Sequence, residues 1–464
     1  MQRYENTAKP PTSGTVRIVA LGCAKNLVDT ERVAGNFQRR GWRQVADGPA
    51  DVVVVTTCGF IAASAQESVD TLLEEIQAKE RGETRYLVAA GCLPDRYRND
   101  LCREMDELDL VVGVTEMTRL PELVEENFAG RLKRWEFSSR SLNAPVEGPR
   151  ILSGPPWRSY LKIADGCNQG CTFCIIPRIR GAQRSIPLND LVEEARTLAA
   201  SGVVELSLIA QDLTSYGTDL YGAKTLPRLL EALERVDGLR WIRLLYAHPA
   251  HFDDDMVRAM TENEKVVPYL DIPFQHISDR MLTAMNRHMD RAGHERLLDR
   301  LRSRVPDIAI RTTFITGFPG ETAEDFEELY EFAREWHFDN VGVFPYSREE
   351  NTPAFGMAGH VVEKVAEERM DRLMTLQRGI SRDLLWAKRD RVISVLVEEE
   401  LAPEPGDRYT HLGRALNQAP EIDGLTYLHV PDGAAVMTGD IVAARVETAS
   451  DYDLFAALVE VDPA

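Results

Sequence analysis

The chain has 464 residues, 44% of them hydrophobic and 28% charged, which is typical of a globular protein with more than one domain. Its 54 basic and 74 acidic residues give a net charge of −20, whereas a protein that depends on phosphate contacts usually has a basic surface. No apolar run reaches the roughly 20 residues of a membrane helix, and the polar start lacks the apolar core of a secretory signal. We therefore expect a cytoplasmic protein, not bound to a membrane, whose seven cysteines stay reduced and serve metal binding or catalysis.

The first part of the chain alternates predicted strands and helices. Each predicted strand is a run of β-branched or other apolar residues, such as DVVVVTT at 51–57. This alternation predicts a parallel α/β sheet in an N-terminal domain over residues 14–136. The expected strands are 16–22, 51–57, 85–91 and 108–114, and the expected helices include 26–40 and 68–80.

Residues 137–156, FSSRSLNAPVEGPRILSGPP, are rich in Ser, Pro and Gly and are predicted to be a linker. The alternation resumes over residues 157–390. Six strands in series predict an open, partial (β/α)6 barrel, because a complete barrel of this type has eight. The expected strands are 159–164, 203–209, 241–247, 269–274, 308–315 and 340–346, and the expected helices include 188–200, 322–336 and 361–389.

The last segment, residues 391–464, has a different pattern. Short strand candidates such as VISVLVEEE (392–400) and IVAARVETAS (441–450) are separated by turn signals, which predicts a small all-β barrel or sandwich. The segment contains four Arg, no Lys and fourteen Asp or Glu, so its balance of 4 − 14 = −10 is half of the net charge of the chain.

Three cysteines follow the first predicted barrel strand with the spacing C-x3-C-x2-C, at Cys167, Cys171 and Cys174. The carboxyl ends of barrel strands are where active sites of such folds are built. A structural zinc site needs four ligands, and the neighbouring sequence offers no His. A thioredoxin-like pair would explain CTFC but not Cys167. A four-iron cluster on three cysteines, with one iron left open, explains the count.

Three further cysteines, Cys23, Cys58 and Cys92, each come directly after a predicted strand of the N-terminal domain. Because the carboxyl ends of parallel strands lie along one edge of a sheet, these thiols are expected to converge. A glycine stands next to each, which lets backbone approach a bulky group; these glycines are Gly22, Gly59 and Gly91. The alternative is that the three are buried small hydrophobes. For Cys102, on a predicted helix, this structural role is the expected one.

The C-x3-C-x2-C motif at the start of a partial barrel resembles the radical S-adenosylmethionine (SAM) superfamily. The resemblance implies a 4Fe-4S cluster whose open iron binds SAM, and includes the aromatic Phe173 of CTFC. GFPGET (317–322) is similar to the superfamily's glycine-rich SAM segment, which implies SAM contacts at Gly317 and Gly320. LIAQDLTSYG (208–217) resembles another active-site segment and adds Gln211 and Asp212 to the cofactor-binding candidates.

The whole domain order resembles the methylthiotransferase family, which has an N-terminal domain with three cysteines, a radical SAM barrel and a C-terminal TRAM barrel. The resemblance implies that Cys23, Cys58 and Cys92 hold an auxiliary 4Fe-4S cluster that presents the sulfur to be inserted. It also implies two uses of SAM, one as methyl donor and one as the source of a hydrogen-abstracting radical. Sulfur and electron donors are therefore expected as partners.

Members of this family modify either transfer RNA or a ribosomal protein. LGCAKNLVDTE (21–31) is similar to the ribosomal-protein branch, whereas the transfer-RNA branch usually has Gln-Met-Asn after the cysteine. An acidic TRAM barrel also suits a basic ribosomal protein better than phosphates, unless its acidic residues serve solubility alone. The resemblance then implies an aspartate of small-subunit ribosomal protein twelve as the acceptor and 3-methylthio-aspartate as the product.

Three rival functions stay open at this point: a transfer-RNA adenosine methylthiotransferase, a non-catalytic iron–sulfur scaffold or electron carrier, and a zinc-binding interaction protein. Several polar residues near strand ends have two interpretations each. Asp165, His248 and His276 either line the site or serve structure. Arg178 and Arg180 either bind the SAM carboxylate or make salt bridges.

Overall fold

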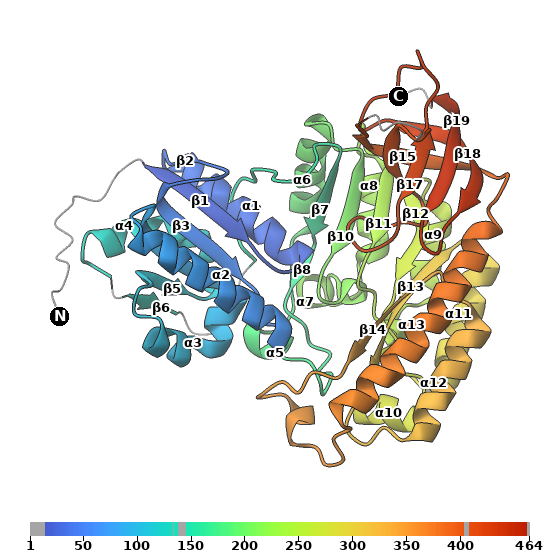
Figure 1. Cartoon of the computed structure of the whole chain (residues 1–464), viewed down its shortest axis with the longest axis horizontal. Helices are drawn as coiled ribbons and strands as arrows, with labels where there is room; N and C mark the ends of the chain where they lie inside the picture. The colour runs from blue at the N-terminus through green and yellow to red at the C-terminus, as the bar shows by residue number, and fades with distance from the viewer. Residues whose placement is uncertain (1–13, 133, 138–144, 403–407, 462–464) are drawn as a thin grey trace.

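The computed structural model describes residues 14–132, 134–137, 145–402 and 408–461, and consists of three units along the chain (Figure 1). The N-terminal unit, drawn in blue and teal, is a six-stranded, all-parallel sheet with the order β2-β1-β3-β4-β5-β6. Its elements are β1 Thr15–Ala20, α1 Ala24–Arg39, β2 Arg43–Gln44, β3 Ala50–Thr57, α2 Ala62–Glu80, β4 Thr84–Gly91, α3 Cys92–Glu104, β5 Leu110–Val112, a 3-10 turn Val114–Arg119, α4 Leu120–Phe128 and β6 Trp135–Glu136.

The run of four valines in β3 shows why this sheet is covered on both faces. Val52 and Val54 point into the core shared with α1 and α4, whereas Val53 and Val55 point into the core shared with α2 and α3. A strand buried on both faces reads as a continuous apolar run, as parallel sheets do. The predicted α/β class is confirmed. The sequence analysis missed the two-residue edge strands β2 and β6.

The central unit is an open sheet of six parallel strands in the order β14-β13-β12-β11-β10-β7, so the predicted partial barrel is confirmed. Its main strands are β7 Arg158–Lys162, β10 Glu205–Ile209, β11 Trp241–Leu244, β12 Val266–Asp271, β13 Ala309–Thr316 and β14 Asn340–Pro345, and a small ladder pairs β8 Ala164–Asp165 with β9 Arg184–Ser185. The helices are α5 Ile176–Ile179, α6 Leu188–Ala200, α7 Thr218–Tyr221, α8 Leu226–Glu234, α9 Asp254–Glu262, α10 Asp279–Ala284, α11 Arg291–Arg304, α12 Ala323–Trp336 and α13 Glu363–Trp386.

The C-terminal unit, drawn in red, is a closed five-stranded barrel. Its strands are β15 Val392–Glu400, β16 His411–Ala415, β17 Thr426–His429, β18 Ile441–Ala449 and β19 Leu454–Val461. The sequence analysis did not identify β16 and β19. The domain limits 14–136, 157–390 and 391–464 remain our proposal, and residues 138–144 of the proposed linker 137–156 lie outside the described residues.

All three units meet inside the open barrel. One apolar cluster joins Val28 of α1, Tyr269 of β12, Leu396 of β15 and Ile441 of β18. The N-terminal unit also reaches both edge strands of the open sheet. Beside β7, helix α1 contacts the strand directly; beyond β14, Arg96 of α3 forms a buried ion pair with Glu349. The carboxyl ends of the two parallel sheets are thereby held together.

No helix in the described part of the chain is both long and apolar enough to cross a membrane.

Candidate active site

The loop that carries the barrel cysteines is fixed from two sides. On one side Cys167 N donates to Gly181 O at 3.2 Å; on the other Thr172 N donates to Met285 O, just after α10, at 3.1 Å. Gly166, with φ +74°, starts the loop, and a Cβ atom there would lie 2.3 Å from Ala182 O. Only glycine fits this turn, which explains on steric grounds why a glycine precedes Cys167.

Two thiols of this loop, those of Cys167 and Cys174, resist ionisation without a bound cation. Burial raises the pKa of Cys167 to about 11 and that of Cys174 to about 12. Arg287 donates to Cys171 Sγ at 3.5 Å and brings a positive charge to the same loop. Thiolate is the form that binds metal. These thiols therefore need positive charge nearby to ionise, and a bound iron centre would supply it.

The N-terminal cysteines follow β1, β3 and β4, which are neighbours in the sheet, as expected. Their glycines make the three loops pack against one another. A Cβ atom at Gly22 would lie 2.8 Å from Cβ of Cys58, and one at Gly59 would lie 3.1 Å from Cys92 O. Cys58 and Cys92 are buried, whereas Cys23 is exposed. Burial raises the pKa of Cys92 to about 12.

Asn26, which the sequence analysis did not single out, connects these loops. Its Nδ2 donates to Leu21 O and to Thr57 O, both at 3.0 Å, at the ends of the strands that precede Cys23 and Cys58. Its Oδ1 lies 3.9 Å from Cys92 Sγ. The amide therefore touches all three cysteine loops. Within the sequence, only its place three residues after Cys23 could have marked it.

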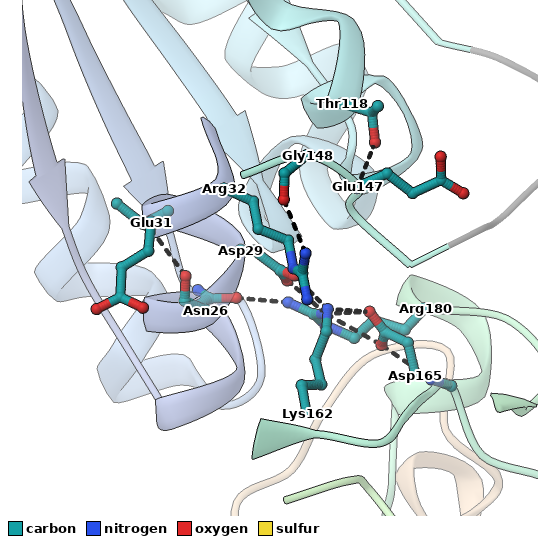
Figure 2. A network of polar contacts seen from close by, with 12 residues as sticks. Asn26, Asp29, Glu31, Arg32, Thr118, Glu147, Gly148, Lys162, Asp165 and Arg180 are labelled. Carbon is teal, nitrogen blue, oxygen red and sulfur yellow. Dashed lines mark hydrogen bonds and ion pairs between the residues drawn. The ribbon is translucent and has the colours of Figure 1, made fainter. Parts of the chain in front are cut away.

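A buried network of charges joins Asn26 to the barrel (Figure 2). Arg180 donates to Asn26 Oδ1, and its Nη1 lies 3.0 Å from an oxygen of Asp29 and 2.8 Å from one of Asp165. Lys162 lies 3.0 Å from Asp165 and also pairs with Asp29. Burial acts to raise the pKa of Asp165, but the charges of Arg180 and Lys162 outweigh it and lower that pKa.

This network decides between the two interpretations of Arg180, which is a salt-bridge residue. Arg180 is buried and pairs with carboxylates on both units, whereas Arg178 is exposed. Asp165 likewise forms ion pairs within this network, and it also accepts a hydrogen bond from Gln211 Nε2 at 3.0 Å. The side-chain oxygen of Gln211, Oε1, is buried and has no hydrogen-bond partner among the described residues. An unpaired buried acceptor at this edge fits a polar cofactor.

The other proposed SAM-contacting residues lie around the same carboxyl edge of the barrel. Asp212 accepts from Thr214 N at 3.0 Å and from Gln169 Nε2 of the cysteine loop at 2.5 Å. Phe173 packs against the small apolar cluster that contains Phe318.

The glycine-rich segment follows β13 and has two glycines in the left-handed region, Gly317 with φ +74° and Gly320 with φ +84°. Gly317 N donates to the carboxylate of Glu321. A Cβ atom at Gly317 would lie 2.3 Å from Cβ of Ala366, whereas one at Gly320 would meet only the flexible Arg280 side chain at 3.6 Å. Sterics therefore require glycine at Gly317, and the backbone conformation favours it at both.

The two candidate histidines, His276 and His248, differ in whether their ring nitrogens have hydrogen-bond partners. His276 uses both ring nitrogens inside the fold: Nε2 lies 3.3 Å from Glu321 Oε1, and Nδ1 accepts from two backbone N–H groups. His248 is only 5% exposed, and neither of its ring nitrogens has a partner among the described residues. Burial lowers the pKa of His248, so its imidazole is neutral. His248 is thus the stronger candidate to face a ligand.

Across the described ranges, no three His, Cys, Asp or Glu side chains meet closely enough to ligate one metal ion. The two sets of three thiols at strand ends, with buried cations beside them, have the ligand chemistry of thiolate-bound iron–sulfur clusters.

Comparison with known proteins agrees with this architecture. A model of the radical SAM superfamily matches residues 161–333, one of the uncharacterized protein family UPF0004 matches 15–113, and one of the TRAM domain matches 391–459. Among solved structures, the radical S-adenosylmethionine methyltransferase TsrM from Kitasatospora setae superposes with a TM-score of 0.56 at 17% identity, over 74% of this chain and 77% of that one. A likeness at this identity concerns the fold alone.

Curated relatives match almost end to end. Ribosomal protein uS12 methylthiotransferase RimO of Anaeromyxobacter sp. (strain K) is 46% identical over 96% of this chain and 93% of its own length. The protein of the same name from Symbiobacterium thermophilum is 44% identical over 96% of this chain and 91% of its own. The radical SAM match implies SAM and a 4Fe-4S cluster. From the identity and the coverage together, the chain belongs to the family of the ribosomal protein uS12 methylthiotransferases RimO.

Proposed function

We propose that this protein transfers a methylthio group to the β-carbon of an aspartate in small-subunit ribosomal protein uS12, giving 3-methylthio-aspartate. The observation that supports this most is the pairing of two cysteine sets, one at the carboxyl edge of each parallel sheet, across one buried network of charges. An enzyme that inserts sulfur by radical chemistry needs a radical source and a sulfur source side by side.

The residues that would hold the groups follow from their loops. Cys167, Cys171 and Cys174 would hold the radical SAM 4Fe-4S cluster, and the N-terminal set would hold the auxiliary one; that set is Cys23, Cys58 and Cys92. When bound, SAM and the clusters supply the radical, the methyl group and the sulfur. The β-hydrogen of aspartate is not acidic enough for a side-chain base, so radical abstraction suits it.

On the protein side, we assign SAM contacts to the barrel edge. Gln211 has a buried oxygen free to accept from SAM. Gly317 is buried against Ala366, and Gly320 offers its backbone beside the flexible Arg280 side chain. Phe173 and Asp212 would shape the pocket from the cysteine loop and from the turn after β10.

The proposed partner is the basic ribosomal protein, free or in the ribosome, and the acidic charge disfavours transfer RNA. The C-terminal barrel exposes Glu399, Glu400, Glu421 and Asp432, and such a surface attracts a basic protein and repels phosphates. We also propose a cytoplasmic location and separate donors of sulfur and electrons.

A competition experiment tests the substrate. The enzyme with reconstituted clusters receives SAM, sulfide and a reductant without oxygen, together with uS12 and hypomodified transfer RNA. Mass spectrometry is expected to find the methylthio group on an aspartate of uS12. Modification of adenosine instead would replace the proposed substrate, and intact SAM with neither product would favour a non-catalytic scaffold.

A further inference from the structure

Lys25 lies where the loop of Cys23 meets the barrel. It is the second residue after Cys23, in the first turn of α1, and is only 8% exposed. Its Nζ lies 3.4 Å from the ring centroid of Tyr246, which follows β11 at the carboxyl edge of the barrel. A lysine of the auxiliary site thus extends its ammonium group to the mouth of the barrel.

Three other cations of this interface, Lys162, Arg180 and Arg311, already have carboxylate partners. Lys162 and Arg180 pair with Asp29 and Asp165. Asp423 accepts from Arg311 at 2.8 Å. These cations are therefore neutralised within the protein.

Lys25 differs, because no carboxylate within the described ranges forms an ion pair or hydrogen bond with its ammonium group. The nearby Asp271 is held elsewhere: it accepts from Tyr246 N at 3.0 Å and lies 3.9 Å from Arg311. An aromatic face stabilises an ammonium group without cancelling its charge. Burying an unpaired cation costs free energy, so an anion that binds beside the ammonium group of Lys25 is stabilised.

We propose that the ammonium group of Lys25 binds the side-chain carboxylate of the acceptor aspartate and so selects an acidic acceptor. The inference rests on the proposed function, since it names the group that recognises that substrate. A carboxylate at Lys25 lies next to Cys23, which is the exposed member of the auxiliary set. The β-carbon attached to that carboxylate is then held between the two cluster sites.

The test compares two peptides on the cluster-loaded full chain. One is the uS12 segment with its acceptor aspartate, and the other has Asn at that position. The wild-type chain is expected to bind the Asp peptide more tightly, and Lys25→Met should weaken that binding by at least about 10-fold, as expected for a lost hydrogen bond between charged groups. The same variant should leave binding of the Asn peptide nearly unchanged, and Lys25→Arg should restore most of the preference.

The control variant is Lys364→Met, whose side chain is 82% exposed on α13. It removes the same charge, and a more acidic protein should bind a basic peptide slightly better, so net charge cannot explain a loss. Iron content and the EPR signals of both clusters are measured in each variant. The inference is wrong if Lys25→Met still prefers the Asp peptide, if it binds both peptides equally more weakly, or if it loses the auxiliary cluster. Methylthio transfer to adenosine by the wild type would instead overturn the proposed function.

Discussion

Asp29, Lys162, Asp165 and Arg180 form a neutral set of two carboxylates and two cations that is almost closed to water. A complete set of this kind contributes little net stability, because desolvation offsets the attraction. Removing one member is different, since it leaves an uncompensated buried charge. The network therefore fixes how the N-terminal unit docks on the barrel more than how strongly each folds.

Lys162→Met tests this at the residue scale. The variant leaves two carboxylates with one cation, and the free energy of unfolding should fall by about 3–5 kcal/mol. Denaturant unfolding measures it. The exposed Arg178→Gln is the matched control and should change stability by less than about 0.5 kcal/mol. Equal small effects in the two variants would mean that water reaches the network.

At the scale of elements, the described part of the linker is packed against helix α1. Arg150 pairs with Glu31 of α1 and, at 2.9 Å, with Glu194 of α6. A Cβ atom at Gly35 of α1 would lie only 2.0 Å from Pro149 O. Ser, Pro and Gly in this segment predicted irregular structure, and the segment is irregular, yet it is an ordered strap between two units.

Gly35→Ala has two opposing effects, and packing decides between them. Alanine favours a helix by about 1 kcal/mol over glycine, but here it would overlap a backbone carbonyl, so the strap or the helix must move. We expect net destabilisation in thermal unfolding. Gly379→Ala in α13 is the control, because nothing lies within 4 Å of its added Cβ, and this variant should be stabilised by up to about 1 kcal/mol. The same sign in both would contradict the packing argument.

At the scale of the whole molecule, the C-terminal barrel is joined to the central unit by buried charges. Glu205 of β10 lies between Arg243 of β11 and Arg414 of β16. Burial acts to raise the pKa of Glu205, but the two guanidinium groups outweigh it and lower that pKa to about 2. Tyr269 Oη also donates to Asp423 of the C-terminal unit at 2.7 Å.

The pH dependence follows from the sign of this shift. Because the folded-state pKa of Glu205 is below its ordinary value of 4.5, its stabilising contribution is complete above about pH 4.5. The contribution, on the order of 3 kcal/mol, is lost as the pH falls toward 2. Glu205→Gln should thus be much less stable than wild type at pH 7, and the difference should shrink in acid. Urea unfolding at several pH values measures this, with the exposed Glu350→Gln as control; a gap independent of pH would contradict it.

Much of the fold and of the site could be predicted because the signals are local. Strands such as β3 are continuous apolar runs, and Cys23, Cys58 and Cys92 stand where such runs end. The parallel topology then places those ends together without further information. Short strands such as β2 and β6 gave no signal in the sequence. They are strands because they pair with a neighbouring strand, not because their own residues favour that conformation.

The sequence by itself determined the three units, the six cysteines at strand ends and the glycines that their loops need, because all of these depend on residues close together in the chain. Only the tertiary structure decided what each polar side chain does. Arg180 is a salt-bridge residue because Asp29, 151 positions away, is folded against it. Lys25 faces Tyr246 across a domain boundary for the same reason. Partnership between distant charges is a property of the packed molecule, and no local pattern encodes it.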